Sequence, residues 1–132
     1  MVKPVLHLIG CLALALPMLA AAGESRGEMA EVGDAERGAL IYDSRCIGCH
    51  SLAANRIGPR HNDVFGREIG SLKDFDYSEA LQKAGGTWDR AALDLWLADP
   101  EAYLPGQRMN FMVSEPQDRA DLIAFLQQEA ER

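Results

Sequence analysis

Apolar residues along this chain recur at helical spacing, and no stretch alternates apolar and polar residues in the manner of a half-buried strand. Near the C-terminus, for example, Leu122, Ile123, Phe125 and Leu126 fall on one face of a helix. Four segments are expected to be helical: about 34–42, 77–83, 88–98 and 116–129. The pattern therefore predicts an all-α domain of short helices joined by long loops.

Residues at the ends of these segments supply the expected caps. Asp34 and Thr87 precede the first and third segments, and Asp76 or Ser78 begins the second. Their side-chain oxygens can accept hydrogen bonds from the free N–H groups of a first helical turn. Asp99-Pro100 ends the third segment, because a proline disfavours helical geometry in the residue before it.

Gly38 lies inside the first expected helix, where glycine is less favourable than alanine by ~1 kcal/mol. It is either an inherited weak point or a position where another helix crosses and needs the missing side chain.

The apolar core that the chain can form is small. About 100 ordered residues with few aromatic side chains give a modest core. The long loops are therefore expected to enclose a cofactor that adds apolar surface.

The first 22 residues have the composition of a secretory signal peptide, which predicts export to the periplasm. Lys3 gives a positive start, residues 5–19 are mainly apolar, and three alanines at 20–22 offer a cleavage site. A polar leader is expected at 23–33 and a single domain at 34–132.

Two other fates of the N-terminal segment are compatible with parts of the sequence. Cys11 follows a sequence like a lipoprotein cleavage box, but lipidation there would leave an apolar region of only about four residues. Retention as an uncleaved anchor is also disfavoured, because the apolar run is shorter than the about 20 residues that span a bilayer. We therefore expect a mature protein that is not membrane-anchored.

The charge of the chain argues against nucleic acid as a partner. The formal net charge is −7, and removal of residues 1–22 would take away Lys3 and no acid, giving −8. No basic stripe of the kind that binds phosphates is present. Residues 45–83, with six bases and five acids, are the least acidic part of the expected domain.

The strongest chemical motif is Cys46-Ile47-Gly48-Cys49-His50. Two thiols three positions apart, followed by an imidazole, suit covalent haem attachment, in which each sulfur bonds a haem vinyl group and the histidine ligates iron. A redox pair would be expected after a strand, and a zinc site would need a second Cys/His pair downstream. A disulfide between Cys46 and Cys49 would close a very short, strained loop.

A sixth iron ligand can come from Met109, Met112 or His61, or the position can stay open. Met109 lies in a loop with Pro105-Gly106 at residues 101–114 and is favoured, because a thioether is a soft ligand that raises the reduction potential. Met112 is three residues later. His61 lies too near the attachment motif to reach the opposite face easily.

Motifs that follow one another along residues 33–128 resemble those of the class I monohaem cytochromes c, the small soluble carriers of mitochondria and bacteria. The resemblance rests on Gly33-Asp34, Gly38, Tyr42, the haem-attachment motif, Gly58-Pro59, Phe65-Gly66-Arg67, Gly70, Phe75, Tyr77-Ser78, Trp88, Leu93, Trp96-Leu97, Pro100, Pro105-Gly106, Met109 and residues 121–126. It implies three to five short helices and long loops wrapped around one haem c, bound through Cys46 and Cys49.

The resemblance also implies roles for individual residues. Gly38 is similar to the glycine at which the first and last helices cross, with Tyr42 and Phe125 packed beside it. Pro59 resembles the proline whose carbonyl accepts the Nδ1–H of the haem-ligating histidine. Residues similar to those that neutralise or hydrogen-bond the buried haem propionates are Arg67, Tyr77 and Trp88.

Several positions depart from the family pattern. His61 stands where an apolar haem contact is usual, Leu81 where many members have asparagine, and Gln107 where a small hydroxyl residue is usual near the loop proline. The ring of lysines typical of mitochondrial carriers is largely absent. These departures concern the haem surroundings and the docking of partners more than the fold.

The resulting hypothesis is a monomeric, periplasmic single-electron carrier that is not an enzyme, with haem iron ligated by His50 and Met109. It would link a donor dehydrogenase or a bc-type complex of a respiratory chain to an oxidase, reductase or photosynthetic centre, docking redox partners at an exposed haem edge. Two other functions are compatible with the sequence: a dedicated haem subunit of one dehydrogenase, and a small haem peroxidase for which His61 would serve as acid and base.

Overall fold

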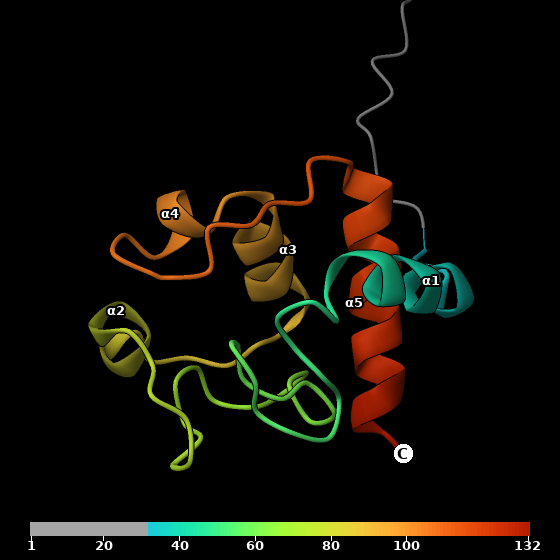
Figure 1. Cartoon of the computed structure of the whole chain (residues 1–132). Helices are drawn as coiled ribbons and strands as arrows, with labels where there is room; N and C mark the ends of the chain where they lie inside the picture. Colours follow the sequence, from blue (N-terminus) through green and yellow to red (C-terminus); the bar gives the residue numbers. More distant parts are fainter. Residues whose placement is uncertain (1–31) are drawn as a thin grey trace, which may run out of the picture.

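The computed structural model describes residues 32–132, so the expected signal segment and most of the expected leader lie outside the described residues. Five α-helices form this part of the chain (Figure 1). They are α1 (Ala35–Arg45), α2 (Glu79–Lys83), α3 (Arg90–Ala98), α4 (Pro100–Tyr103) and α5 (Pro116–Ala130). Between residues 32 and 132 the only β-type pairing is one isolated bridge between Glu68 and Thr87. The prediction of an all-α domain with short helices is confirmed.

The boundaries of two helices differ from those expected. Helix α1 continues to Arg45, and α3 is capped by Asp89, whose side chain accepts the N–H of Ala92, so the prediction that Thr87 caps α3 is wrong. The physical reason is a backbone pairing: Trp88 N–H donates to the Arg67 carbonyl at 2.9 Å, which keeps this part of the chain extended. A helix cannot begin until that pairing ends.

The sequence pattern predicts a loop at residues 101–114 and does not predict the short helix α4, so this prediction is wrong for residues 101–103. Asp99 ends α3 and at once caps α4, accepting the N–H of Ala102 at 3.0 Å, with Pro100 in the first turn. An N-cap aspartate followed by proline is a recognised start signal, so the sequence did contain the information.

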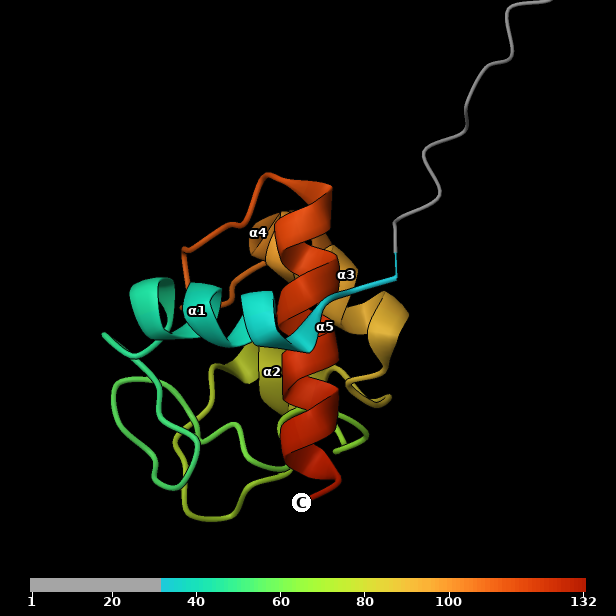
Figure 2. The same ribbon diagram turned by 90° about the vertical axis from the view of Figure 1, so that its right-hand side faces the viewer.

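Helices α1 and α5 cross steeply, as Figure 2 shows, and the crossing needs Gly38. A Cβ at Gly38 would lie 2.8 Å from Phe125 Cβ and still closer to the Asp121 carbonyl. The Tyr42 and Phe125 rings pack beside this contact with centroids 5.2 Å apart. The expected crossing at Gly38 is therefore present.

Asp121 ties the start of α1 to the middle of α5. Its side chain is completely buried, and one oxygen accepts the Asp34 N–H at 2.7 Å and the Gln117 side-chain amide at 2.9 Å. Arg37 lies 2.7 Å from the other oxygen as an ion pair. A buried carboxylate is tolerated only with such partners, so this residue holds α1 in place.

Helices α2, α3 and α4 lie on the other side of α5 from α1, and the long loop 46–78 runs between the two groups (Figure 1). The buried core includes Trp88, Leu93, Trp96, Val113, Leu122, Ile123 and Leu126. Within residues 32–132, no helix combines the length and the apolar composition that crossing a bilayer requires.

Candidate cofactor site

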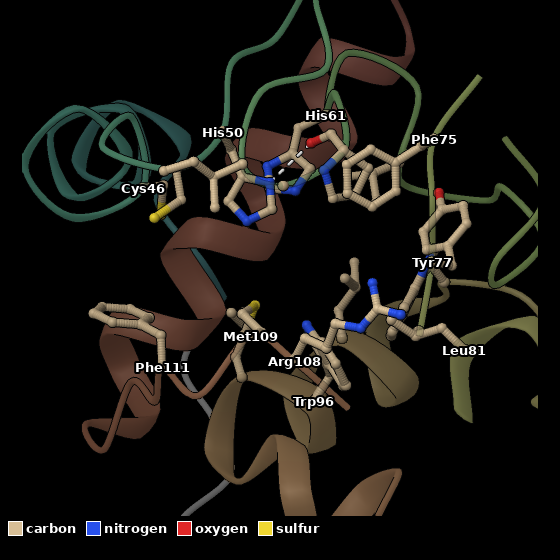
Figure 3. A pocket seen from close by; sticks show the side chains of 18 of the residues that line it. Cys46, His50, His61, Phe75, Tyr77, Leu81, Trp96, Arg108, Met109 and Phe111 are labelled. Carbon is tan, nitrogen blue, oxygen red and sulfur yellow. Dashed lines mark hydrogen bonds between the residues drawn. The ribbon is translucent and has the colours of Figure 1, made fainter. Parts of the chain in front are cut away.

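A cavity of about 220 Å³ opens between the long loop and the helices. Figure 3 shows two facing sides, which we call the His50 side (residues 46–61) and the Met109 side (residues 99–113). Its lining is largely apolar and includes Val64, Phe75, Leu81, Leu93, Trp96, Leu97, Phe111 and Leu126. The resemblance named some of these residues, but the sequence did not identify them as walls of one cavity.

The attachment motif begins where α1 ends. Cys46 is the C-cap of α1, and its carbonyl accepts the N–H groups of Cys49 and His50 at 3.1 and 2.9 Å. This turn brings both sulfurs and the imidazole to the same cavity. Burial raises the pKa of Cys46 to about 11, so its sulfur is a protonated thiol at neutral pH.

Three neighbours, Pro59, Gly58 and His61, fix the orientation of the His50 imidazole. Its Nδ1 lies 2.8 Å from the Pro59 carbonyl oxygen, which can only accept, so Nδ1 carries the proton and Nε2 keeps a lone pair. Burial lowers the pKa of His50, and the bond to Pro59 opposes part of that shift. A Cβ on Gly58 would overlap the ring, so this position must remain glycine. The result is a neutral imidazole whose Nε2 lone pair is free to bind a metal, as an iron ligand requires.

His61 lies beside His50 and not opposite it. The two rings stack with centroids 4.0 Å apart and an interplanar angle of 22° (Figure 3). Burial lowers the pKa of His61 well below its ordinary value, and nearby His50 and Arg67 lower it further. His61 is thus a neutral side chain on the same side of the cavity as His50, and its Nδ1 is buried with no hydrogen-bond partner.

Met109 occupies the facing side. Its side chain lines the cavity, and Figure 3 shows its sulfur turned toward His50 across the open space. Met112, the other methionine considered, is 59% exposed and is not among the lining residues. Of the candidates for a sixth ligand, only Met109 lies opposite His50.

Unpartnered buried donors mark one end of the cavity. Arg67 forms an ion pair with Asp63 and donates to the Arg60 carbonyl, but its Nε is buried without a partner. The Tyr77 hydroxyl is also buried without a hydrogen bond of ordinary geometry. Burial raises the pKa of Tyr77, and Arg67 and the nearby backbone of Leu72 oppose this, so the phenol stays a donor.

The residues present fit a haem group. Two thiols and a free imidazole nitrogen lie on one side and a thioether on the other, while two buried donors, Arg67 and Tyr77, suit an anionic substituent. Trp88 is buried and also lines the cavity. Every site residue expected from the sequence, including Pro59, therefore lies at this cavity.

Comparisons with known proteins point in the same direction. The sequence profile of the family described as "Cytochrome c" matches residues 35–129. Cytochrome c of Cochliobolus lunatus is 42% identical over 103 residues, which cover 75% of this chain and 95% of that protein. Cytochrome c2 of Rhodomicrobium vannielii is 43% identical over 98 residues, covering 71% and 78%. The solved structure of cytochrome cH from Methylobacterium extorquens superposes with a TM-score of 0.69 at 39% identity, over 73% of this chain and 99% of that one.

Proposed function

The chain belongs to the cytochrome c family, and from that premise we propose that it is a periplasmic single-electron carrier whose iron is ligated by His50 and Met109. As a member of this family it carries electrons with redox partners and is not an enzyme. One haem c, bound covalently through Cys46 and Cys49, supplies the one-electron couple. The observation that carries the proposed ligation is that His50 and Met109 face each other across one cavity.

The two proposed ligands would suit electron transfer in different ways. The Pro59 carbonyl holds the Nδ1 proton of His50, which fixes the tautomer and makes Nε2 a better donor. The thioether of Met109 is soft and uncharged, so it favours the reduced metal and raises the reduction potential. If His50 and Met109 both ligate the iron, small molecules such as O₂ would be kept from the metal.

Arg67, Tyr77 and Trp88 are proposed to hold the haem propionates. Buried carboxylates need charge-assisted hydrogen bonds, because they lose their hydration in a dry site. Arg67 Nε and the Tyr77 hydroxyl are buried donors with no partner of ordinary geometry among the described residues, which supports this assignment. Trp88 is proposed for the same role on the resemblance alone.

The proposed partners are a donor dehydrogenase or bc-type complex and an acceptor such as an oxidase, reductase or photosynthetic centre. The expected signal at residues 1–22 supports export, and we expect a monomer. Ile57 and Phe111 are exposed and line the cavity, so partners would dock there. If the less acidic segment 45–83 steers docking, association should slow with added salt; rates that do not change with salt would contradict this steering.

A peroxidase is the weaker alternative. It would need an open sixth position with an acid and base beside it, and His61 was the residue that suggested one. Since His61 stacks on His50, it cannot serve the opposite face.

Visible spectra of protein matured by a c-type haem assembly system test the proposed ligation. The oxidised wild-type protein should show the weak far-red band of thioether-ligated iron, and the reduced protein should not bind CO at neutral pH. Met109→Ala should lose the band and bind CO. An unchanged spectrum in Met109→Ala would contradict the assignment of Met109, and rapid CO binding by the wild type would contradict a closed carrier.

A further inference from the structure

Gln107 is a buried polar residue two positions before Met109, in the loop that leads to it. It is only 8% exposed, although glutamine is usually a surface residue. It also replaces the small hydroxyl residue that the family resemblance predicts at this place. A buried carboxamide must form hydrogen bonds, so its partners show what it does.

All hydrogen-bonding capacity of the Gln107 side chain is used within the described loop and α4. Its Oε1 accepts the backbone N–H of Met109 and, at 3.1 Å, that of Asn110. Its Nε2 donates to Glu101 Oε2 at 3.2 Å and to Asn110 Oδ1 at 3.1 Å. A carboxamide has two donor hydrogens and two acceptor lone pairs, so this one side chain binds the backbone N–H groups of Met109 and Asn110 and connects them to Glu101.

Glu101 connects this cluster to a helix. Its other carboxylate oxygen accepts the Gly106 N–H at 3.0 Å, so one carboxylate binds both the Gly106 backbone and the Gln107 side chain. Glu101 lies on α4, whose first turn is capped by Asp99 at the end of α3. The loop is thereby linked through Glu101 and Gln107 to helices α3 and α4.

The residue after Met109 shows that this geometry is held by its surroundings. Asn110 has a φ of +48°, in the left-handed region, which few residues other than glycine adopt and which asparagine tolerates better than most. Both its N–H and its side-chain oxygen are bonded to Gln107. Without Gln107, the Met109–Asn110 backbone would be free to leave this conformation.

We propose that Gln107 is the positioning residue that keeps the Met109 thioether at the iron. This inference rests on the proposed His50/Met109 ligation and adds what maintains it. An external ligand can bind only while Met109 has moved away, so its apparent affinity is reduced by the small fraction of open protein. Removal of the Gln107 hydrogen bonds should raise that fraction and leave the His50 side unchanged.

The test is imidazole binding to the oxidised holoprotein, followed by its absorption spectrum. Gln107→Ala should bind imidazole about tenfold more tightly than wild type, as expected for the loss of about 1.4 kcal/mol of closure free energy. Gln117→Ala is the matched control, because Gln117 is a hydrogen-bonded glutamine on α5, away from the loop. It should stay within about twofold of wild type even if the free energy of unfolding falls.

Glu101→Gln provides a second variant in case Gln107→Ala does not mature. It keeps one acceptor oxygen and loses the other, so it can hold either Gly106 or Gln107 but not both; imidazole affinity should rise about threefold. Affinities within about twofold of wild type for Gln107→Ala, or at the wild-type value for Glu101→Gln, would overturn the proposal. An oxidised wild type without the thioether band would overturn the ligation and the role of Gln107 together, whereas a wild type with the band and unaffected variants would overturn the role of Gln107 alone.

Discussion

The two sides of the cavity are built by different means. On the His50 side, the attachment cysteines, the imidazole and its partner Pro59 all lie within residues 46–59, and the Gly58 N–H returns to the Cys49 carbonyl at 2.8 Å. On the Met109 side, a loop with a left-handed Asn110 is held by the side chains of Gln107 and Glu101. One side is fixed by steric fit and short-range backbone contacts, and the other by a side-chain network connected to α4.

This difference indicates which of the two proposed bonds to the iron, from His50 or from Met109, should break first. The His50 ring cannot rotate without meeting Gly58 or its stacked neighbour His61. Met109 can leave the proposed iron site when a few hydrogen bonds break, and each of these contributes a net stabilisation of about 1 kcal/mol. We therefore expect the carrier to exchange its sixth ligand far more readily than its fifth.

Gly58→Ala should damage the His50 side most. The new Cβ would overlap the imidazole, whose Nδ1 is held by the Pro59 carbonyl and whose face stacks on His61, so the free energy of unfolding should fall by about 3 kcal/mol. Denaturant unfolding of the holoprotein, with the yield of matured protein, measures this. Gly48→Ala is the control, because nothing lies within 4 Å of its Cβ. Equal stability of the two variants would show that the ring is not confined as described.

His61→Leu should change the pH dependence of stability. The pKa of His61 is lowered in the folded protein, so below about 6.5 the unfolded chain binds a proton that the native one does not. Wild-type stability should therefore fall as pH drops from 7 toward 5, by at most about 1.4 kcal/mol per pH unit from this residue. The leucine variant should show a flatter curve in denaturant titrations. Parallel curves would contradict a neutral, buried His61.

Tyr77→Phe tests the end of the cavity where the unpartnered donors of Arg67 and Tyr77 lie. If the Tyr77 hydroxyl binds a propionate, its removal should cost about 1 kcal/mol of holoprotein stability. If the hydroxyl has no partner, removing a buried unsatisfied group should stabilise the protein instead. Thermal unfolding of the two holoproteins gives the sign, and a stabilised variant would exclude the proposed contact.

Met112→Ala should have the smallest effect. Met112 is exposed and does not line the cavity, so its loss should change stability by less than about 0.5 kcal/mol. The far-red band and the reduction potential should also stay at their wild-type values, in contrast to Met109→Ala. Loss of the far-red band in Met112→Ala would indicate that Met112, and not Met109, is the sixth ligand.

Parts of the site that depend on short-range spacing could be read from the sequence. The cysteine pair, the histidine and the all-α pattern depend on residues close together in the chain. Gly38 indicated the helix crossing, because a glycine that destabilises the middle of a helix suggests a close contact with another part of the fold. The error at the start of α3 arose because Thr87 pairs with a segment some twenty residues earlier, at Glu68. Local cap preference cannot report such a pairing.

Covalent attachment and helical periodicity are local properties of the chain, so the order of residues was enough to identify the cofactor chemistry and the kind of fold. The placement of the proposed sixth ligand depends on the tertiary structure. That structure placed His61 beside His50, left Met112 outside the cavity, and joined Gln107 to Glu101 and to the backbone of Met109. Burial and hydrogen-bond partners depend on how loops and helices come together in space, and no local pattern of residues specifies that arrangement.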